Sequence, residues 1–99
     1  MKKTALITGA SAGLGVEFAR NFAKDGYNLV LASRRTERME KLADDLRIRH
    51  NVTVKVLGKD LRNMIEVQSI FDTLQRENIH IDILVNNAGI QHVAPVETF

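Results

Sequence analysis

The fold is decided at Thr8-Gly9-Ala10-Ser11-Ala12-Gly13-Leu14-Gly15, a glycine-rich stretch near the start of the chain. It follows a short apolar run with β-branched residues, and helical spacing of apolar residues follows it. Between a strand and a helix, three glycines let the chain reverse tightly, bring backbone N–H groups to a phosphate and pack the helix close to the strand. Because the first turn of a helix presents unpaired N–H groups and the positive end of its dipole, the stretch predicts a pyrophosphate site. A glycine-rich stretch can also be only a turn. The elements and motifs that follow it have to distinguish a phosphate site from a simple turn.

Four apolar runs are typical of strands. They lie at residues 4–8, 28–33, 52–57 and 81–85, and the second is almost continuously apolar, as expected of a strand that is buried on both faces.

Three helices are expected between these runs. The first ends near Gly26, which suits a left-handed C-terminal position. The second begins at about Thr36, buries Met39, Leu42, Ala43 and Leu46, and closes near Asn51. The third is predicted by Asn63 and Glu66 at capping-box spacing, followed by apolar residues at helical intervals. The order is therefore βαβαβαβ, which predicts one Rossmann-like, doubly wound α/β segment over residues 1–99, with a parallel sheet of strand order 3-2-1-4.

Composition excludes several classes of protein. The 99 residues carry 14 basic and 12 acidic side chains without aromatic interleaving, so nucleic acid is not an expected partner. There is no cysteine for a disulfide or a nucleophile, and no apolar run of membrane-spanning length. The three histidines, His50, His80 and His92, lack metal-ligand spacing. We expect a cytoplasmic protein without a bound metal.

With these elements in place, the chain resembles the short-chain dehydrogenase/reductase family along its whole length. Residues 8–15 resemble that family's TGxxxGxG turn, Asp60-Leu61 its adenine-contacting pair, and residues 86–89, NNAG, its motif after the fourth strand. The resemblance implies hydride transfer between a nicotinamide dinucleotide and a carbonyl or hydroxyl substrate. The expected cofactor-binding residues are Gly9, Ser11, Gly13, Leu14, Gly15, Ser33, Arg34, Asp60, Leu61, Asn86, Ala88 and Gly89.

The chemistry of these residues agrees with the resemblance. The Asp60 carboxylate can accept from an adenine amino group, while Leu61 offers an apolar flank to the ring. Asn86 and Asn87 can tie the fourth strand to its neighbours, beside the nicotinamide ribose. Each also has a simpler interpretation, Asp60 as a turn or helix-capping residue and the asparagines as a strand-end turn.

The end of the second strand favours NADP over NAD. A fold that selects NAD usually places an acid there to bind the ribose 2′-hydroxyl, but this chain has Ser33 followed by Arg34 and Arg35. No carboxylate repels a 2′-phosphate, and Arg34 supplies a planar cationic fork. The alternative is that these arginines only form a solvated helix start.

A shorter resemblance follows residue 89. The stretch around Gln91 is similar to the D-3-hydroxybutyrate dehydrogenases of the family, which implies that Gln91 holds a substrate carboxylate. Those enzymes generally use NAD, which conflicts with Ser33 and Arg34, so the substrate stays open. Gln91 is equally interpreted as a loop residue.

The family's catalytic serine, tyrosine and lysine have no counterpart among these residues. Tyr27 is the one tyrosine, and Leu31 stands four residues later where lysine would be needed. We therefore expect no catalytic residue and no turnover by this chain alone. Residues 83–85 of the fourth strand are expected to form an exposed parallel edge, which predicts a fragment of a longer polypeptide or a homo-oligomer. The alternatives to an oxidoreductase segment are a non-catalytic nucleotide-binding module and a self-associating truncated product.

Overall fold

The computed structural model describes residues 2–87 and 92–95, which form one five-stranded sheet and three helices. The sheet order is β3-β2-β1-β4-β5, with β1 to β4 parallel. The predicted Rossmann-like fold with order 3-2-1-4 is thus confirmed. The elements are β1 (Thr4–Thr8), α1 (Gly13–Lys24), β2 (Asn28–Ser33), α2 (Thr36–His50), β3 (Val54–Gly58), α3 (Met64–Arg76), β4 (Ile83–Asn86) and β5 (His92–Pro95).

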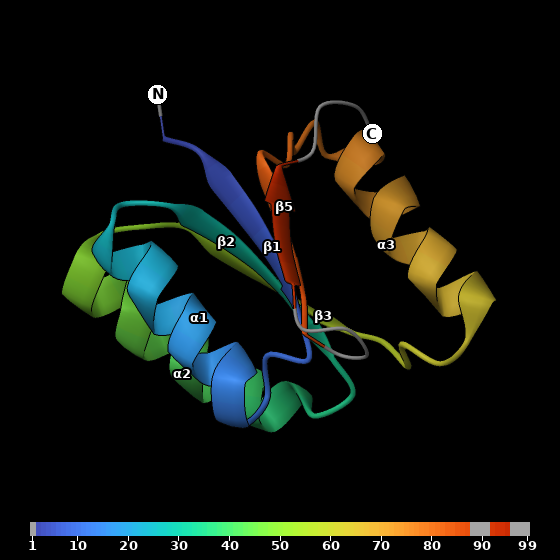
Figure 1. The fold of residues 1–99 in the computed structure, drawn as a ribbon, viewed down its shortest axis with the longest axis horizontal. Helices are drawn as coiled ribbons and strands as arrows, with labels where there is room; N and C mark the ends of the chain where they lie inside the picture. The colour runs from blue at the N-terminus through green and yellow to red at the C-terminus, as the bar shows by residue number, and fades with distance from the viewer. Residues whose placement is uncertain (1, 88–91, 96–99) are drawn as a thin grey trace.

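The helices cover both faces of the sheet. Figure 1 shows α1 and α2 together on one face and α3 on the other. The strands alternate accordingly, because neighbouring side chains point to opposite faces. In β1, Ala5 and Ile7 join the core beneath α1 and α2, whereas Leu6 joins the core beneath α3. The continuously apolar runs of the sequence are therefore explained by two cores, one on each face.

The helix ends follow the local sequence in most details. Gly26 and Asn51 adopt the left-handed conformation, with φ of 88° and 53°, and the Asn63 side chain caps α3 by accepting from two backbone N–H groups. The capping box is wrong in its second half, because the Glu66 carboxylate accepts from the N–H of Asp60 rather than that of Asn63. That bond ties the loop before α3 to the helix.

The predicted exposed edge on β4 is wrong. β5 pairs with β4 in antiparallel orientation, with Leu84 opposite Ala94 and Val85 opposite Val93. An edge strand presents unpaired N–H and C=O groups, and the returning segment satisfies them. The argument for self-association along β4 loses its basis, and the oligomeric state itself stays a prediction.

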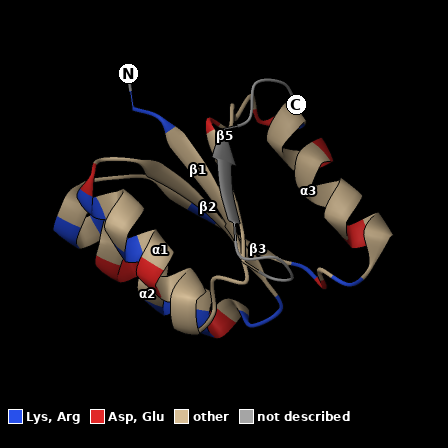
Figure 2. Cartoon of the chain, in the orientation of Figure 1, with Lys and Arg blue, Asp and Glu red and all other residues tan. Residues whose placement is uncertain are grey.

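Charges of both signs are interspersed on the outer surfaces of α1 and α2 (Figure 2). Asp45 on α2 links the two helices, since it pairs with Arg20 of α1 at 3.1 Å and with Arg49 at 2.7 Å.

Within residues 2–87 and 92–95, no helix combines the length and apolar character needed to cross a membrane.

Replacing Gly15 in α1 with alanine is predicted to destabilise the fold. A methyl group at Gly15 would collide with the Gly9 backbone, and it would lie only 2.9 Å from Ala10 Cα. Helix propensity favours alanine over glycine by about 1 kcal/mol, but forced overpacking costs about 1–3 kcal/mol and more for contact with rigid backbone. We expect Gly15→Ala to lower the free energy of unfolding in urea by about 1–3 kcal/mol. Glu17→Ala, at an exposed position of the same helix, is the control and should change it by less than about 0.5 kcal/mol.

Candidate functional site

The glycine turn joins β1 to α1 at the carboxyl end of the sheet. Gly9 and Gly13 have φ of 68° and 57°, in the left-handed region that favours glycine. The Gly9 N–H donates to the Ala32 carbonyl at 2.8 Å, which fixes the turn against the end of β2. Gly15 is the point of close approach between α1 and the turn. The turn therefore has the shape of a backbone cradle at a helix N-terminus, which suits an anionic phosphate.

The end of β4 is bonded to the same turn. The Thr8 hydroxyl accepts from the Asn87 N–H at 3.1 Å and lies 3.2 Å from Asn86 Oδ1, to which it can donate. The Asn87 side-chain amide donates to the Gly9 carbonyl at 3.2 Å. The predicted tie between the asparagines and the neighbouring strand is confirmed. Thr8, which the sequence analysis did not single out as a site residue, supplies the hydroxyl for two of these three contacts.

The end of β2 lies on the other side of the glycine turn. Ser33 Oγ and Ser11 Oγ are 3.0 Å apart, so a residue of the turn and the last residue of β2 meet directly. Arg34, the next residue, is exposed. The structure thus brings two hydroxyls together at this corner, with the exposed arginine next to them in the chain.

Asp60 lies beyond the end of β3 and is held by Arg62. Asp60 Oδ1 accepts from the backbone N–H of Arg62 at 3.0 Å and from Arg62 Nε at 3.2 Å. The Arg62 guanidinium keeps the pKa of Asp60 below its ordinary value of 3.8, the Arg62 backbone N–H acts in the same direction, and the charge of Arg34 adds to it. Asp60 is therefore an ionised acceptor near neutral pH. The turn interpretation of Asp60 is confirmed, and it leaves the adenine role open as a second use of the same carboxylate.

Leu61 and Leu14 differ in their surroundings. Leu61 packs against the core beneath α3 and lines an apolar cavity of about 460 Å³ together with Thr8, Asn86 and residues of α3. Leu14 is 55% exposed at the start of α1. An apolar surface is thus available beside the crevice, next to Asp60.

Three predicted site residues, Ala88, Gly89 and Gln91, lie outside the described residues. Among the others, the structure brings Ser11 to Ser33 and the turn to Asn86 and Asn87. Arg62 was missed by the sequence analysis. The available signal was a cation two residues after the aspartate, a spacing at which an Asx turn joins the aspartate side chain to the backbone N–H of the later residue.

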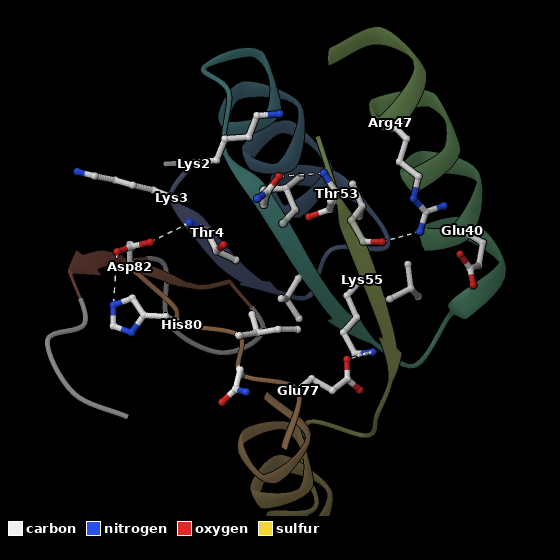
Figure 3. A pocket seen from close by; sticks show the side chains of 17 residues that line it. Lys2, Lys3, Thr4, Glu40, Arg47, Thr53, Lys55, Glu77, His80 and Asp82 are labelled. Atoms are coloured by element: carbon white, nitrogen blue, oxygen red, sulfur yellow. Dashed lines mark hydrogen bonds and ion pairs between the residues drawn. The ribbon is translucent and has the colours of Figure 1, made fainter. Parts of the chain in front are cut away.

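A second, larger cavity of about 890 Å³ lies at the amino ends of the strands (Figure 3). Its charged side chains largely satisfy one another or the backbone. Lys55 pairs with Glu77 at 2.8 Å, and Asp82 accepts from the Thr4 N–H at 2.9 Å. Ligands of open α/β sheets bind at the carboxyl ends of the strands, so this cavity is not the candidate site.

Tyr27 lies away from the crevice, at the amino end of β2. Tyr27 precedes β2, and its ring packs edge-on against Phe22 with centroids 5.0 Å apart. Within the described part of the chain, no group of three or more His, Asp or Glu residues is arranged to hold a metal ion.

This geometry defines the class of protein, a Rossmann-like α/β fold with a polar crevice at the point where the strand order reverses. The chain belongs to the short chain dehydrogenase family, whose sequence model matches residues 3–99.

Known proteins of similar sequence and structure support membership of this family. The uncharacterized oxidoreductase YxjF of Bacillus subtilis is 40% identical over 98 residues, which are 99% of this chain and 38% of that protein. A short-chain dehydrogenase from Sphingobium yanoikuyae in complex with NADPH has a TM-score of 0.80 and 42% identity, over 89% of this chain and 34% of the other. L-Sorbose reductase from Gluconobacter frateurii, complexed with NADPH and L-sorbose, has a TM-score of 0.83 and 35% identity, over 90% and 34% of the two chains. This chain spans little more than a third of the length of these relatives.

The ion pair with Arg62 predicts how Asp60 titrates. Removing the guanidinium in Arg62→Ala takes away the strongest interaction that favours the carboxylate, so the pKa of Asp60 should rise toward 3.8. The wild-type carboxylate therefore keeps its charge to lower pH than the variant does. A carboxyl ¹³C NMR titration measures the shift, with Asp45 as an internal reference because Arg49 and Arg20 set its lowered pKa independently. An unchanged Asp60 titration would contradict the ion pair.

Proposed function

We propose that this chain is the NADP-binding portion of an oxidoreductase that moves a hydride between the nicotinamide and a carbonyl or hydroxyl group of a small molecule. The observation that carries the proposal is the corner between β1 and β2. There the hydroxyls of Ser11 and Ser33 meet at 3.0 Å, with the Arg34 cation next in the chain and no carboxylate at the strand end. One serine hydroxyl donates to the other, so the pair keeps one hydroxyl proton for a ligand. That donor and the Arg34 guanidinium suit a ribose 2′-phosphate, which a carboxylate in that place would repel.

The remaining parts of the crevice fit the rest of the cofactor. A methyl group at Gly15 would fill the space by which α1 approaches the turn, and the backbone of residues 9–15 is the candidate cradle for the pyrophosphate. Asp60 offers an ionised acceptor for the adenine amino group, and Leu61 adjoins an apolar cavity on which a ring can pack. In this proposal Asn86, Ala88 and Gly89 face the nicotinamide side. The bound cofactor supplies the hydride, and this part of the protein binds and orients it.

The relatives support NADP as the cofactor. The similar structures from Sphingobium yanoikuyae and Gluconobacter frateurii contain NADPH. The substrate is proposed only by class, as a carbonyl or alcohol, because one relative holds L-sorbose whereas the residues around Gln91 resemble those of hydroxybutyrate dehydrogenases.

Cofactor preference tests the proposal through Arg34. We expect Arg34→Ala to weaken NADP binding about tenfold or more, since a hydrogen bond to a charged group contributes about 1.5–3 kcal/mol, and to leave NAD binding nearly unchanged. Isothermal titration of wild type and variant with both cofactors measures this. Arg49→Ala, which removes the same charge at the far end of α2, is the control and should affect neither. Equal affinity for NAD and NADP with a harmless Arg34→Ala would sink the assignment.

A turnover assay tests whether residues 1–99 can carry out the reaction without further residues. The 99 residues hold no tyrosine followed four residues later by lysine, the pair that would exchange a proton with the substrate oxygen. We expect no NADPH oxidation by residues 1–99 with a panel of ketones and aldehydes, even where NADP binds. Carbonyl reduction above the uncatalysed rate would refute this expectation.

A further inference from the structure

We infer that Arg62 is a positioning residue for adenine recognition, because its guanidinium and backbone N–H lock the Asp60 carboxylate in one orientation and leave an acceptor position for the adenine 6-amino group. This inference rests on the proposed function, in which Asp60 faces the adenine. It adds a specificity role for a residue that acts through the Asp60 carboxylate.

The acceptor positions of Asp60 decide what remains for a ligand. An ionised carboxylate has two lone-pair positions on each oxygen. On Oδ1, both are used by Arg62, through its backbone N–H at 3.0 Å and its Nε at 3.2 Å. Oδ2 receives one longer bond, from Arg62 Nη2 at 3.4 Å. Among the described residues, Oδ2 is therefore the oxygen with capacity for a further donor, and a neutral amino group is such a donor.

The backbone of Asp60 is fixed independently of Arg62. Its N–H donates to Glu66 Oε1 at 3.0 Å, and its carbonyl accepts from the Asn63 N–H at 3.0 Å. The preceding residue, Lys59, donates its N–H to the Ser33 carbonyl at 2.9 Å, which joins this loop to the corner proposed for the 2′-phosphate. With the main chain held on both sides, rotation of the carboxylate is the freedom left to Asp60. The bidentate fork of Arg62 removes that freedom before a ligand arrives, and preorganisation of this kind raises affinity.

Exposure separates this role from a contribution to folding. The Arg62 side chain is 75% exposed and that of Asp60 is 30% exposed. Exposed ion pairs add little to folding stability, so the pair is not a device for holding the fold. Its geometric effect on the carboxylate is what remains.

The test pairs a variant of residue 62 with a change to a single group of the cofactor. Wild type and Arg62→Ala are titrated with NADP and with nicotinamide hypoxanthine dinucleotide phosphate, in which an oxo group replaces the 6-amino group. We expect Arg62→Ala to weaken NADP binding roughly three- to tenfold, the range of one hydrogen bond, and to change binding of the hypoxanthine analogue less than twofold. The midpoint of urea unfolding should stay that of wild type. Arg76→Ala, an exposed arginine in the last turn of α3, is the matched control and should alter neither affinity.

The outcomes separate the inference from the proposed function. Equal losses for both cofactors would overturn the inference, since Arg62 would then act on a phosphate or through general charge. No loss for either would overturn it as well. If wild type binds NADP but does not distinguish it from the hypoxanthine analogue, the adenine role of Asp60 fails and the inference with it, while the NADP assignment stands. If wild type binds no NADP, the proposed function itself fails.

Discussion

The close approach of α1 to the turn after β1 is the constraint on which the rest of the structure depends. It is possible because Gly15 has no side chain, and because Ala19 and Ala23, the next buried positions on the same helix face, are small. A helix that lies this near the sheet aims its N-terminal N–H groups at the end of β1. The bond from Gly9 N–H to the Ala32 carbonyl then holds the turn to β2. The absence of a side chain at Gly15 thus determines both how closely α1 packs on the sheet and the shape of the candidate phosphate cradle.

The sheet separates the residues that stabilise the fold from those that form the candidate site. Each central strand buries side chains on both faces, in two clusters under different helices, so the strands contribute rigidity and little chemistry. The polar groups of the candidate site lie at the carboxyl ends of the parallel strands, where backbone and side-chain donors are outside the two cores. Thr8, Ser33 and Asn86 are the last residues of β1, β2 and β4, and each bonds to a neighbouring segment rather than standing alone. The candidate site is therefore organised without a ligand, which lowers the ordering cost of binding one.

The carboxyl-end crevice and the amino-end cavity show why size alone does not identify a site. The larger cavity is lined by pairs such as Lys55 with Glu77, whose charges neutralise each other. At the crevice, Asp60 is also paired, yet one of its oxygens keeps an acceptor position and Arg34 stays exposed. Incompletely satisfied groups at a strand end are what a ligand can use. The same reasoning explains why Arg62 matters despite its exposure, since it acts on the orientation of Asp60 and not on the stability of the fold.

The sequence by itself determined the three helices, the four parallel strands and their order, and it placed the glycine turn, Ser33 and Asn86 at strand ends. These depend on local chemistry, as in the Thr8–Gly15 stretch, the left-handed Gly26 and Asn51, and the Asn63 cap, or on the period of buried residues. Tertiary structure alone decided the pairing of β5 with β4, because satisfaction of an open strand edge is a long-range choice that no local pattern encodes. It also decided three side-chain contacts. These are the contact between Ser11 and Ser33, the hydrogen bond from the Asp60 N–H to Glu66, and the ion pair between Arg62 and Asp60. The spacing of residues in the sequence shows which side chains can come into contact. The packing of the loops and the side-chain rotamers determine which of those contacts form.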